Sequence, residues 1–244
     1  MMKHLKTIIG IVALCAVVSC TKSQNAGSGY VDFMVKNTAE VADMTRSNVS
    51  DYTTLPSTGD FTIVIKDAEN GQVWSGKCSE WDPTTSLVEG EYTVEASYGF
   101  LEVEGFNKPY FYGNQSFTVV GNETVAVEVP VVLGNTIIRI SCSDKFKSYF
   151  HDYNFKLTRD GSDVVIFPKD EDKAAFIDGY KIRVEGTLTS ETKTQTFSKD
   201  YTNLYEATAY TLAFDVPQVE GSTITISFND RVDEVELGNI ELND

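Results

Sequence analysis

Histidine is nearly absent from this chain, whose 244 residues include only His4 and His151. We assign His4 below to a cleaved export signal, which leaves His151 alone in the mature chain. Ser-His-Asp triads, zinc sites built from several histidines and histidine acid–base pairs would all have to share that one residue. We expect His151, between Phe150 and Asp152, to be a loop histidine without a catalytic role.

Known catalytic and metal-binding signatures are missing as well. The sequence holds no G-x-S-x-G, H-E-x-x-H, C-x-x-C or Walker loop. The acidic groups at Asp160/Asp163 and Asp170–Asp172 do not match the D-x-D-x-D-G pattern of a calcium loop, which favours solvated turns. No spacing singles out a carboxylate pair for glycoside hydrolysis. The sequence therefore predicts no enzyme activity, no metal and no cofactor.

Positive charge is also scarce. Lys and Arg number 20 against 36 Asp and Glu, for a formal net charge of −16. Phosphate recognition needs clustered Lys and Arg, so this balance argues against nucleic acid and anionic headgroups as electrostatic partners. With 41% apolar and 23% charged residues, the composition is that of a folded globular chain.

The first twenty residues predict export and lipidation. Lys3 and Lys6 precede the apolar run Ile8–Val18, which has the length of a signal-peptide core and is too short to span a bilayer. The run leads into Val17, Val18, Ser19 and Cys20, which resembles the lipobox of bacterial lipoproteins, whose cysteine receives a diacylglyceryl group. An ordinary signal with a chance cysteine is the alternative. Acylation of Cys20 would anchor the mature protein to a membrane without a transmembrane helix.

The sequence divides into four segments: a signal peptide (1–19), a lipidated cysteine with a flexible tether (20–28), and two domains (29–133 and 134–244). The tether is rich in Ser, Asn and Gly and has no apolar period. Beyond it the period is two. In Phe61–Ile65 and Tyr92–Tyr98 every second residue is apolar, which is typical of strands with one buried face.

The two domains are predicted from internal similarity at a spacing of about 90 residues. Asp60–Lys66 and its Asn70-Gly71 turn return as Asp152–Leu157 and Asp160-Gly161. Val88–Val94 returns as Ile177–Val184, and Ala126–Pro130 returns as Ala213–Pro217. Three matches in the same order indicate a duplication.

Each half holds about seven short alternating runs, which predicts an all-β protein with two tandem immunoglobulin-like antiparallel β-sandwich domains. A small barrel is the alternative that strand number leaves open. We expect the surplus strand Ile224–Phe228 to complete a sheet of the second domain, and Lys145–Phe150 to form one helical turn. Cys78 and Cys142 fall in different domains, so we favour two thiols over a disulfide.

Several motifs of the mature chain resemble those of uncharacterised tandem-domain lipoproteins of gut Bacteroides. They are Gly90-x-Tyr92-x-Val94-x-Ala96, Pro109-Tyr110-x-Tyr112-Gly113 and Phe146-x-x-Tyr149-Phe150-x-Asp152-Tyr153, after a lipobox cysteine and a short tether. The resemblance implies a cell-envelope location and kinship with fimbrillin-like adhesion proteins, and it supplies no catalytic residue. Many surface-exported members carry acidic residues after the cysteine, whereas Thr21–Asn25 has none. An outer-membrane anchor that faces either the cell surface or the periplasm therefore stays open.

A window rich in aromatic residues is a candidate glycan platform. It contains Tyr98, Phe100, Phe106, Tyr110, Phe111, Tyr112 and Phe117, beside carboxylate and amide side chains. Sugar rings need an apolar stacking surface with hydrogen-bonding groups at its rim. Trp81, Tyr110 and Tyr112 are the candidate contacts, and Trp74 is expected in the core. The structural alternative, which we favour, buries Tyr98, Phe106 and Phe117 and lets Tyr110 or Tyr112 close a hairpin.

The predicted function is non-catalytic. The leading hypothesis is an envelope protein, lipid-anchored at Cys20, whose two sandwiches serve adhesion, assembly or scaffolding with a surface glycan or protein as partner. The second is a glycan-binding accessory lipoprotein that uses the aromatics of the first domain. The third is a fimbrillin-like subunit that exchanges a strand between protomers, suggested by the surplus strand Ile224–Phe228.

Overall fold

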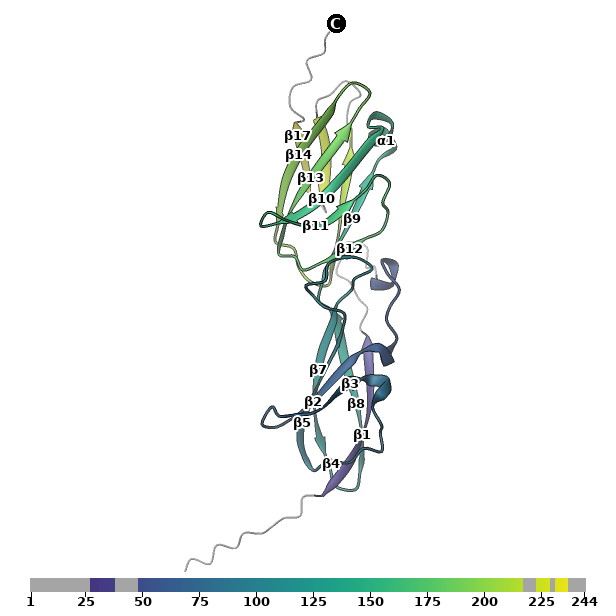
Figure 1. The fold of residues 1–244 in the computed structure, drawn as a ribbon, viewed down its shortest axis with the longest axis vertical. Helices are drawn as coiled ribbons and strands as arrows, with labels where there is room; N and C mark the ends of the chain where they lie inside the picture. Colours follow the sequence, from purple (N-terminus) through teal and green to yellow (C-terminus); the bar gives the residue numbers. More distant parts are fainter. Residues whose placement is uncertain (1–26, 38–47, 217–222, 229–230, 237–244) are drawn as a thin grey trace, which may run out of the picture.

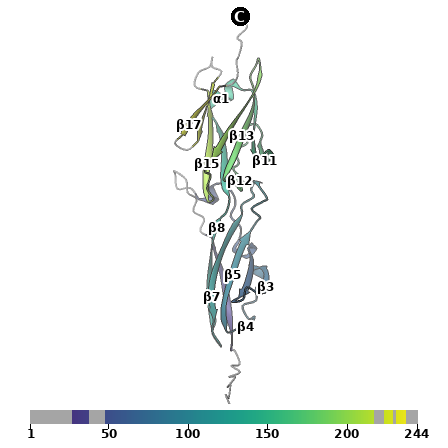
Figure 2. The same cartoon turned by 90° about the vertical axis from the view of Figure 1, so that its left-hand side faces the viewer.

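The protein is an elongated molecule built almost entirely of β-strands (Figure 1). The computed structural model describes residues 27–37, 48–216, 223–228 and 231–236. Two lobes follow one another along the long axis, with strand β1 in the lower lobe and strand β17 in the upper one (Figure 1 and Figure 2). The signal peptide, the lipobox and Cys20 lie outside the described residues. No helix within the described ranges is long and apolar enough to cross a membrane.

The lower lobe is formed by one curled, seven-stranded sheet with the order β3-β2-β5-β7-β8-β1-β4. Its strands are β1 (Ser28–Asn37), β2 (Thr62–Asp67), β3 (Gln72–Lys77), β4 (Leu87–Val88), β5 (Gly90–Tyr98), β7 (Phe111–Val119) and β8 (Thr124–Leu133). Single turns of 3-10 helix occur at Val49–Asp51, Thr58–Asp60 and Cys78–Glu80. Alternation decides the buried face, because Ile63, Ile65 and Val94 are fully buried while Thr62 and Glu95 are exposed.

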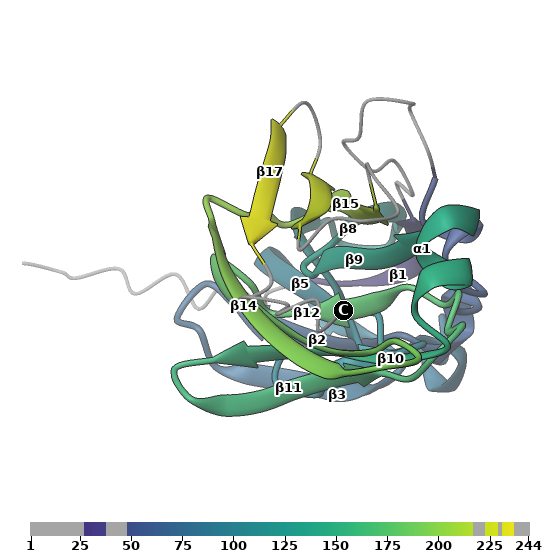
Figure 3. The ribbon, with the colours of Figure 1, turned by 90° about the horizontal axis from the view of Figure 1, so that it is seen from above.

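The upper lobe has two sheets that face each other (Figure 3). One has the order β11-β10-β13-β14 and the other the order β17-β16-β15-β9-β12-β6. Their strands are β6 (Gly105–Phe106), β9 (Thr136–Cys142), β10 (Asp152–Arg159), β11 (Ser162–Phe167), β12 (Ala175–Ile177), β13 (Lys181–Thr189), β14 (Thr194–Thr202), β15 (Thr208–Asp215), β16 (Thr223–Phe228) and β17 (Arg231–Glu236). The expected surplus strand is β16, which pairs with β15 of the same chain. This internal pairing removes the reason for the strand-exchange hypothesis.

The strand directions correct one part of the predicted fold. β1 and β8 run parallel, from Tyr30↔Thr124 to Asn37↔Val131, and β9 and β15 run parallel, from Thr136↔Thr208 to Cys142↔Phe214. In the lower lobe, the β7–β8 pairing also joins the halves of the expected sandwich into one sheet. A period of two reports which face of a strand is buried and carries no information on the direction of its neighbour. The all-β class is confirmed, and the purely antiparallel pairing is wrong.

The two lobes repeat one scheme of strand pairing. The pairs β1–β4, β1–β8, β2–β3, β2–β5 and β5–β7 correspond in order to β9–β12, β9–β15, β10–β11, β10–β13 and β13–β14. A register shift occurs at the corresponding place in both edge hairpins, at Ile65/Lys66 and at Leu157/Thr158. Such bulges twist an edge strand and hinder its pairing with another chain. Both lobes therefore protect the same edge in the same way.

The helix α1 (Asp144–Tyr149) is the helical turn expected from the sequence. Ser143 caps it by accepting a hydrogen bond from the Phe146 N–H at 3.1 Å. Phe146 is fully buried and contacts Phe155 and Phe214, whose rings stack with their centroids 4.1 Å apart. These rings belong to the hydrophobic core of the upper lobe, so the helix closes one end of that core.

Cys78 and Cys142 are free thiols in different lobes, which confirms the preference for thiols over a disulfide. Burial raises the pKa of Cys142 to about 12. Burial likewise raises the pKa of Cys78 above its usual value. A thiol with a raised pKa is a poor nucleophile at neutral pH, so both residues serve as small apolar side chains.

Candidate functional site

The segment between β5 and β7 carries a short strand of the lower lobe into a sheet of the upper lobe. In this strand, β6, Phe106 lies opposite Ala175 and Gly105 lies opposite Phe176 of β12. The Phe106 ring packs edge to face on Phe167, with the ring centroids 5.0 Å apart. Strand pairing and an aromatic contact therefore join the two lobes.

Apolar side chains of the upper strands complete the core of the lower lobe. Ile137 of β9 and Phe176 of β12 are fully buried and belong to the same cluster as Phe111 and Leu133. Bending the molecule here would expose these side chains to water, at a cost of about 25 cal/mol for each Å² of apolar surface. The junction is thus part of a hydrophobic core and resists opening.

A largely buried ion pair lies next to β6. Arg159 Nη1 and Nη2 donate to Glu104 Oε1 and Oε2 at 3.1 and 2.7 Å. The side chains of Arg159 and Glu104 are 27% and 12% exposed. The backbone N–H of Asp178 also donates to Glu104 Oε1, at 2.7 Å. Because Arg159 ends β10 and Asp178 follows β12, one carboxylate of the lower lobe binds both sheets of the upper lobe.

Burial at this position changes the titration of Glu104. It raises the pKa of the carboxyl above its usual value of 4.5, against the lowering by the Asp178 N–H and by Arg159. A folded-state pKa above the unfolded one means that folding favours the protonated carboxyl. The contribution of Glu104 to stability is therefore greatest below the unfolded pKa and is lost as the pH rises through the folded pKa.

We expect mild acid to strengthen the junction rather than open it. When the pH falls from about 7 to about 4, the wild type should gain stability relative to Glu104→Gln, which lacks the titrating proton. Thermal unfolding of both proteins at the two pH values measures this difference. A relative loss of stability of the wild type in acid would contradict the raised pKa of Glu104.

The linker between the lobes, Gly134-Asn135, is hydrogen-bonded to the backbone of Tyr110 in the lower lobe. Asn135 is fully buried, and its Oδ1 accepts a hydrogen bond from the Tyr110 N–H. The rings of Tyr110 and Tyr112 stack, with 5.6 Å between centroids and 11° between planes. A Cβ on Gly134 would lie 2.6 Å from the Tyr110 ring, so a side chain there would displace the stacked pair.

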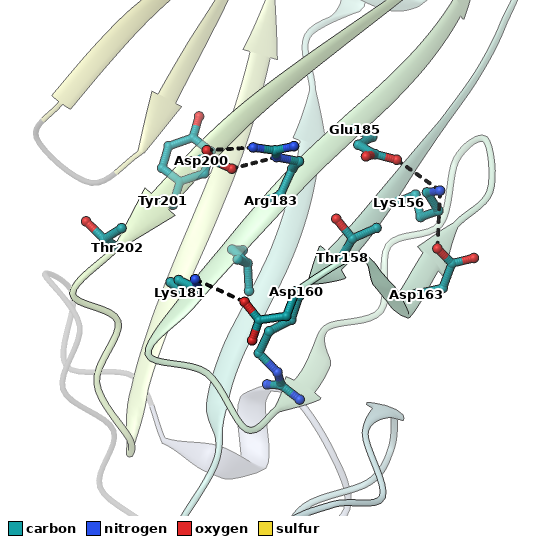
Figure 4. A pocket seen from close by; sticks show the side chains of 13 residues that line it. Lys156, Thr158, Asp160, Asp163, Lys181, Arg183, Glu185, Asp200, Tyr201 and Thr202 are labelled. Carbon is teal, nitrogen blue, oxygen red and sulfur yellow. Dashed lines mark hydrogen bonds and ion pairs between the residues drawn. The ribbon is translucent and has the colours of Figure 1, made fainter.

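The outer face of the sheet β11-β10-β13-β14 carries a shallow groove of about 480 Å³ (Figure 4). Arg159, which binds Glu104, also lines this groove. The other charged side chains of the groove form ion pairs with one another. These pairs are Lys156 with Asp163 at 3.2 Å and with Glu185 at 2.9 Å, Arg183 with Asp200 at 2.7 Å, and Lys181 with Asp160 at 3.0 Å (Figure 4). Because cations and anions neutralise one another, the groove suits a hydroxyl-rich ligand better than a polyanion.

The residues considered for metal binding or catalysis lie on the surface. Asp160 and Asp163 are held in the ion pairs of the groove, and Asp170 accepts a hydrogen bond from the Tyr153 hydroxyl at 2.8 Å. His151 is exposed. Among the described residues, no three His, Cys, Asp or Glu side chains are grouped so that they could hold a metal ion.

One family model covers both lobes of the chain. It is a domain of unknown function, DUF4493, and it matches residues 27–244. The chain belongs to the DUF4493 family. No curated protein matches this DUF4493 chain in sequence.

Solved structures similar to the DUF4493 chain come from Bacteroides and related genera. A fimbrial assembly protein from Parabacteroides distasonis matches with a TM-score of 0.51 and 8% identity over 86% of this chain and 99% of that chain. The fimbrial anchor protein Mfa2 from Porphyromonas gingivalis matches with a TM-score of 0.40 and 10% identity over 85% of this chain and 98% of that chain. A Bacteroides thetaiotaomicron protein for which polysaccharide binding has been suggested matches with a TM-score of 0.48 and 10% identity. This match covers 85% of this chain and 98% of that chain. The predicted resemblance to uncharacterised tandem-domain proteins of Bacteroides and its relatives is confirmed.

In this DUF4493 chain Trp81 is buried, so its predicted role as an exposed glycan contact is wrong. Its side chain is 8% exposed and packs edge to face on Phe33 and Trp74. The indole Nε1 donates to the Val31 carbonyl of β1 at 2.9 Å. Trp74, expected in the core, is half-buried. The sequence could not distinguish the two tryptophans because Trp81 satisfies a backbone carbonyl fifty residues away.

The structure brings Tyr110 and Tyr112 together, and both are half-buried. The Tyr112 hydroxyl donates to Glu206 Oε2 of the upper lobe at 3.2 Å, so it bridges the lobes instead of closing a hairpin. A glycan contact at these two residues stays a prediction. Of the window residues expected in the core, Phe117 is buried, and Tyr98 and Phe106 are half-buried against the two cores.

The residues that hold the junction were not predictable as a group. The sequence offers Glu104 only as a polar neighbour of the aromatic window, and Arg159 is separated from it by 55 positions. The one local signal is the buried Asn135 after Gly134, which stands between two strongly apolar strands where a polar residue needs a partner.

Proposed function

We propose that this DUF4493 protein is a non-catalytic, lipid-anchored protein of the outer membrane that serves adhesion or assembly as a stiff, two-lobe spacer. The observation that carries the proposal is the junction. The pairing of β6 with β12, the Glu104–Arg159 ion pair and the shared core at Ile137 and Phe176 hold the lobes end to end. In this proposal the lobes are the two immunoglobulin-like domains predicted at 29–133 and 134–244.

The similarity to a fimbrial assembly protein supports a role in adhesion or assembly rather than catalysis. At 8% identity this similarity shows a shared fold, and the role in adhesion or assembly is our proposal for this chain. The ion pairs that neutralise the charged side chains of the groove are consistent with this role.

The position of the predicted anchor gives the spacer a direction. β1 begins at Ser28 at the lower end of the molecule, whereas β16 and β17 belong to the upper lobe (Figure 1). Acylation of Cys20 would therefore place the lipid next to the lower lobe, after a short tether. The upper lobe would point away from the membrane, where it can meet a partner.

Metabolic labelling with an alkyne analogue of palmitate tests the anchor. We expect labelled wild type and unlabelled Cys20→Ala, because the acyl chains are attached at Cys20. Cys15→Ala is the matched control, since Cys15 lies inside the apolar run, and it should be labelled like the wild type. Label on Cys20→Ala, or none on the wild type, would refute lipidation at this residue.

Protease treatment of intact cells tests the role in adhesion. Because an adhesive spacer needs its upper lobe outside the cell, we expect added protease to degrade the protein while the cells are still intact. Protection of the protein in intact cells, with cleavage after lysis, would contradict adhesion and leave a scaffold that faces the periplasm.

A further inference from the structure

Two exposed tyrosines lie on neighbouring loops at the base of the upper lobe. Among the described aromatic side chains, Tyr180 and Tyr205 are 67% and 62% exposed, and only Phe100 is comparable at 67%. Tyr180 stands just before β13, and Tyr205 stands between β14 and β15. The Tyr180 hydroxyl donates to Asn203 Oδ1 at 3.0 Å. We call Tyr180, Asn203 and Tyr205 the tyrosine platform.

The backbone under the platform is fixed from below. The Leu204 N–H donates to the Tyr180 carbonyl at 3.0 Å, and the Leu204 side chain is buried in the upper core. The buried Thr136 hydroxyl lies 3.1 Å from the Gly179 carbonyl and 2.9 Å from the Tyr205 carbonyl. One residue of β9 therefore holds both loops together. Because the backbone is already ordered, a ligand that stacks on the rings orders little of the chain when it binds.

The loop of Tyr205 is also held in an unfavourable backbone conformation. Asn203 has φ 61° and Ala207 has φ 50°, both in the left-handed region that side chains other than glycine rarely adopt. Asparagine tolerates this region better than other side chains do, so the strain rests mainly on Ala207, and such strain gathers at functional sites. The conformation directs Leu204 into the core and leaves Asn203 and Tyr205 exposed.

The side chains around the platform define the ligand. Tyrosine faces stack on the apolar side of a sugar ring, while hydroxyl and amide groups bind its hydroxyls. Asp178 and Glu206 are exposed acidic residues on the same two loops, and Lys181 is paired with Asp160. This negative rim disfavours anionic sugars and polyphosphates. The chemistry therefore favours a neutral glycan.

The platform adjoins the groove of Figure 4. Lys181 follows Tyr180, Thr202 precedes Asn203, and these two residues lie opposite each other on β13 and β14. Both line the groove, whose volume of about 480 Å³ exceeds what a single sugar ring needs (Figure 4). A glycan stacked on Tyr180 can therefore extend over the exposed hydroxyl of Thr202.

We propose that the tyrosine platform binds neutral oligosaccharides, with Tyr180 and Tyr205 as stacking surfaces and the adjoining groove as the site of further sugar units. This inference rests on the proposed role in adhesion, for which it names the class of partner.

Calorimetric titration of the purified full chain in detergent tests the platform, with maltoheptaose, cellohexaose and mannohexaose as neutral probes and heparin as the anionic probe. We expect at least one neutral probe to bind with a Kd below about 1 mM. Tyr180→Ala and Tyr205→Ala should each weaken this binding at least about tenfold, because each removes a stacking face. Tyr180→Phe keeps the ring and should lose less than about threefold.

Tyr30→Ala is the matched control, because Tyr30 is a 40% exposed tyrosine on β1 of the lower lobe. This variant should bind the neutral probes with the affinity of the wild type. Unchanged thermal unfolding shows that the platform variants fold. The platform is refuted if no neutral probe binds, if heparin binds more tightly, or if Tyr180→Ala and Tyr205→Ala bind like the wild type. Palmitate labelling and surface exposure are independent readouts, so a failed platform is distinguishable from a failed anchor.

Discussion

Arg159→Ala should lower the free energy of unfolding by about 3 kcal/mol and separate the unfolding of the two lobes into distinct transitions. Removal of the guanidinium leaves the Glu104 carboxylate, 12% exposed, without its cation inside the junction. For a unit of this size, the change corresponds to a Tm lower by roughly 6–12 °C. Differential scanning calorimetry measures both the shift and the number of transitions.

Arg183→Ala provides the matched control. Arg183 also makes two hydrogen bonds to one carboxylate, at 2.7 and 2.9 Å from Asp200, but these side chains are 52% and 60% exposed. An exposed pair contributes about 0–1 kcal/mol, so this variant should unfold almost like the wild type. Equal effects of Arg159→Ala and Arg183→Ala would show that the junction pair has no special role in coupling the lobes.

Gly113→Ala should destabilise the lower lobe by about 3 kcal/mol, because β7 and β8 approach too closely at this point for a side chain. A Cβ on Gly113 would lie 1.9 Å from the Pro130 carbonyl oxygen and 3.0 Å from the Val131 Cα. Both atoms belong to the backbone of β8, so only a shift of one strand relieves the clash. That shift would break the pairing of Tyr112 with Val132, which closes the curled sheet.

Gly161→Ala separates this clash from the general effect of replacing a glycine. Gly161 has φ 83° in a turn, and no atom of the described residues lies within 4 Å of the position that a Cβ would take there. We expect a loss of about 1 kcal/mol from the left-handed conformation alone. Urea unfolding of both variants measures the difference. A Gly113→Ala variant as stable as Gly161→Ala would contradict the close approach of β7 and β8.

The strands and their buried faces were predictable because they depend on residues close together in the sequence. Phe61, Ile63 and Ile65 alternate with outward side chains whatever their neighbours are, and the capped aromatic turn at Phe146 needs only nearby residues. Strand direction was not predictable, because the parallel pair of β1 and β8 joins segments almost one hundred residues apart. Alternation is the same in both directions.

The candidate site was harder to predict, because its residues come from both lobes and are far apart in the chain. Glu104 meets Arg159 only when β6 has paired with β12, and no local pattern marks a strand of two residues. Tyr180 and Tyr205 also gave no signal, since isolated aromatics between strands are usually buried. Their exposure becomes visible only when Leu204 and Thr136 are seen to fix the loops.

The strand β6 also decides how this protein can be divided into fragments. A cut at Gly134 would remove β6, one of the two strands paired with β12, and the isolated upper fragment would present the unpaired edge at Ala175 and Phe176 to water. Unprotected edges recruit other chains, so this fragment should self-associate. A peptide spanning Leu101–Pro109, supplied in trans, should restore a monomer by complementation.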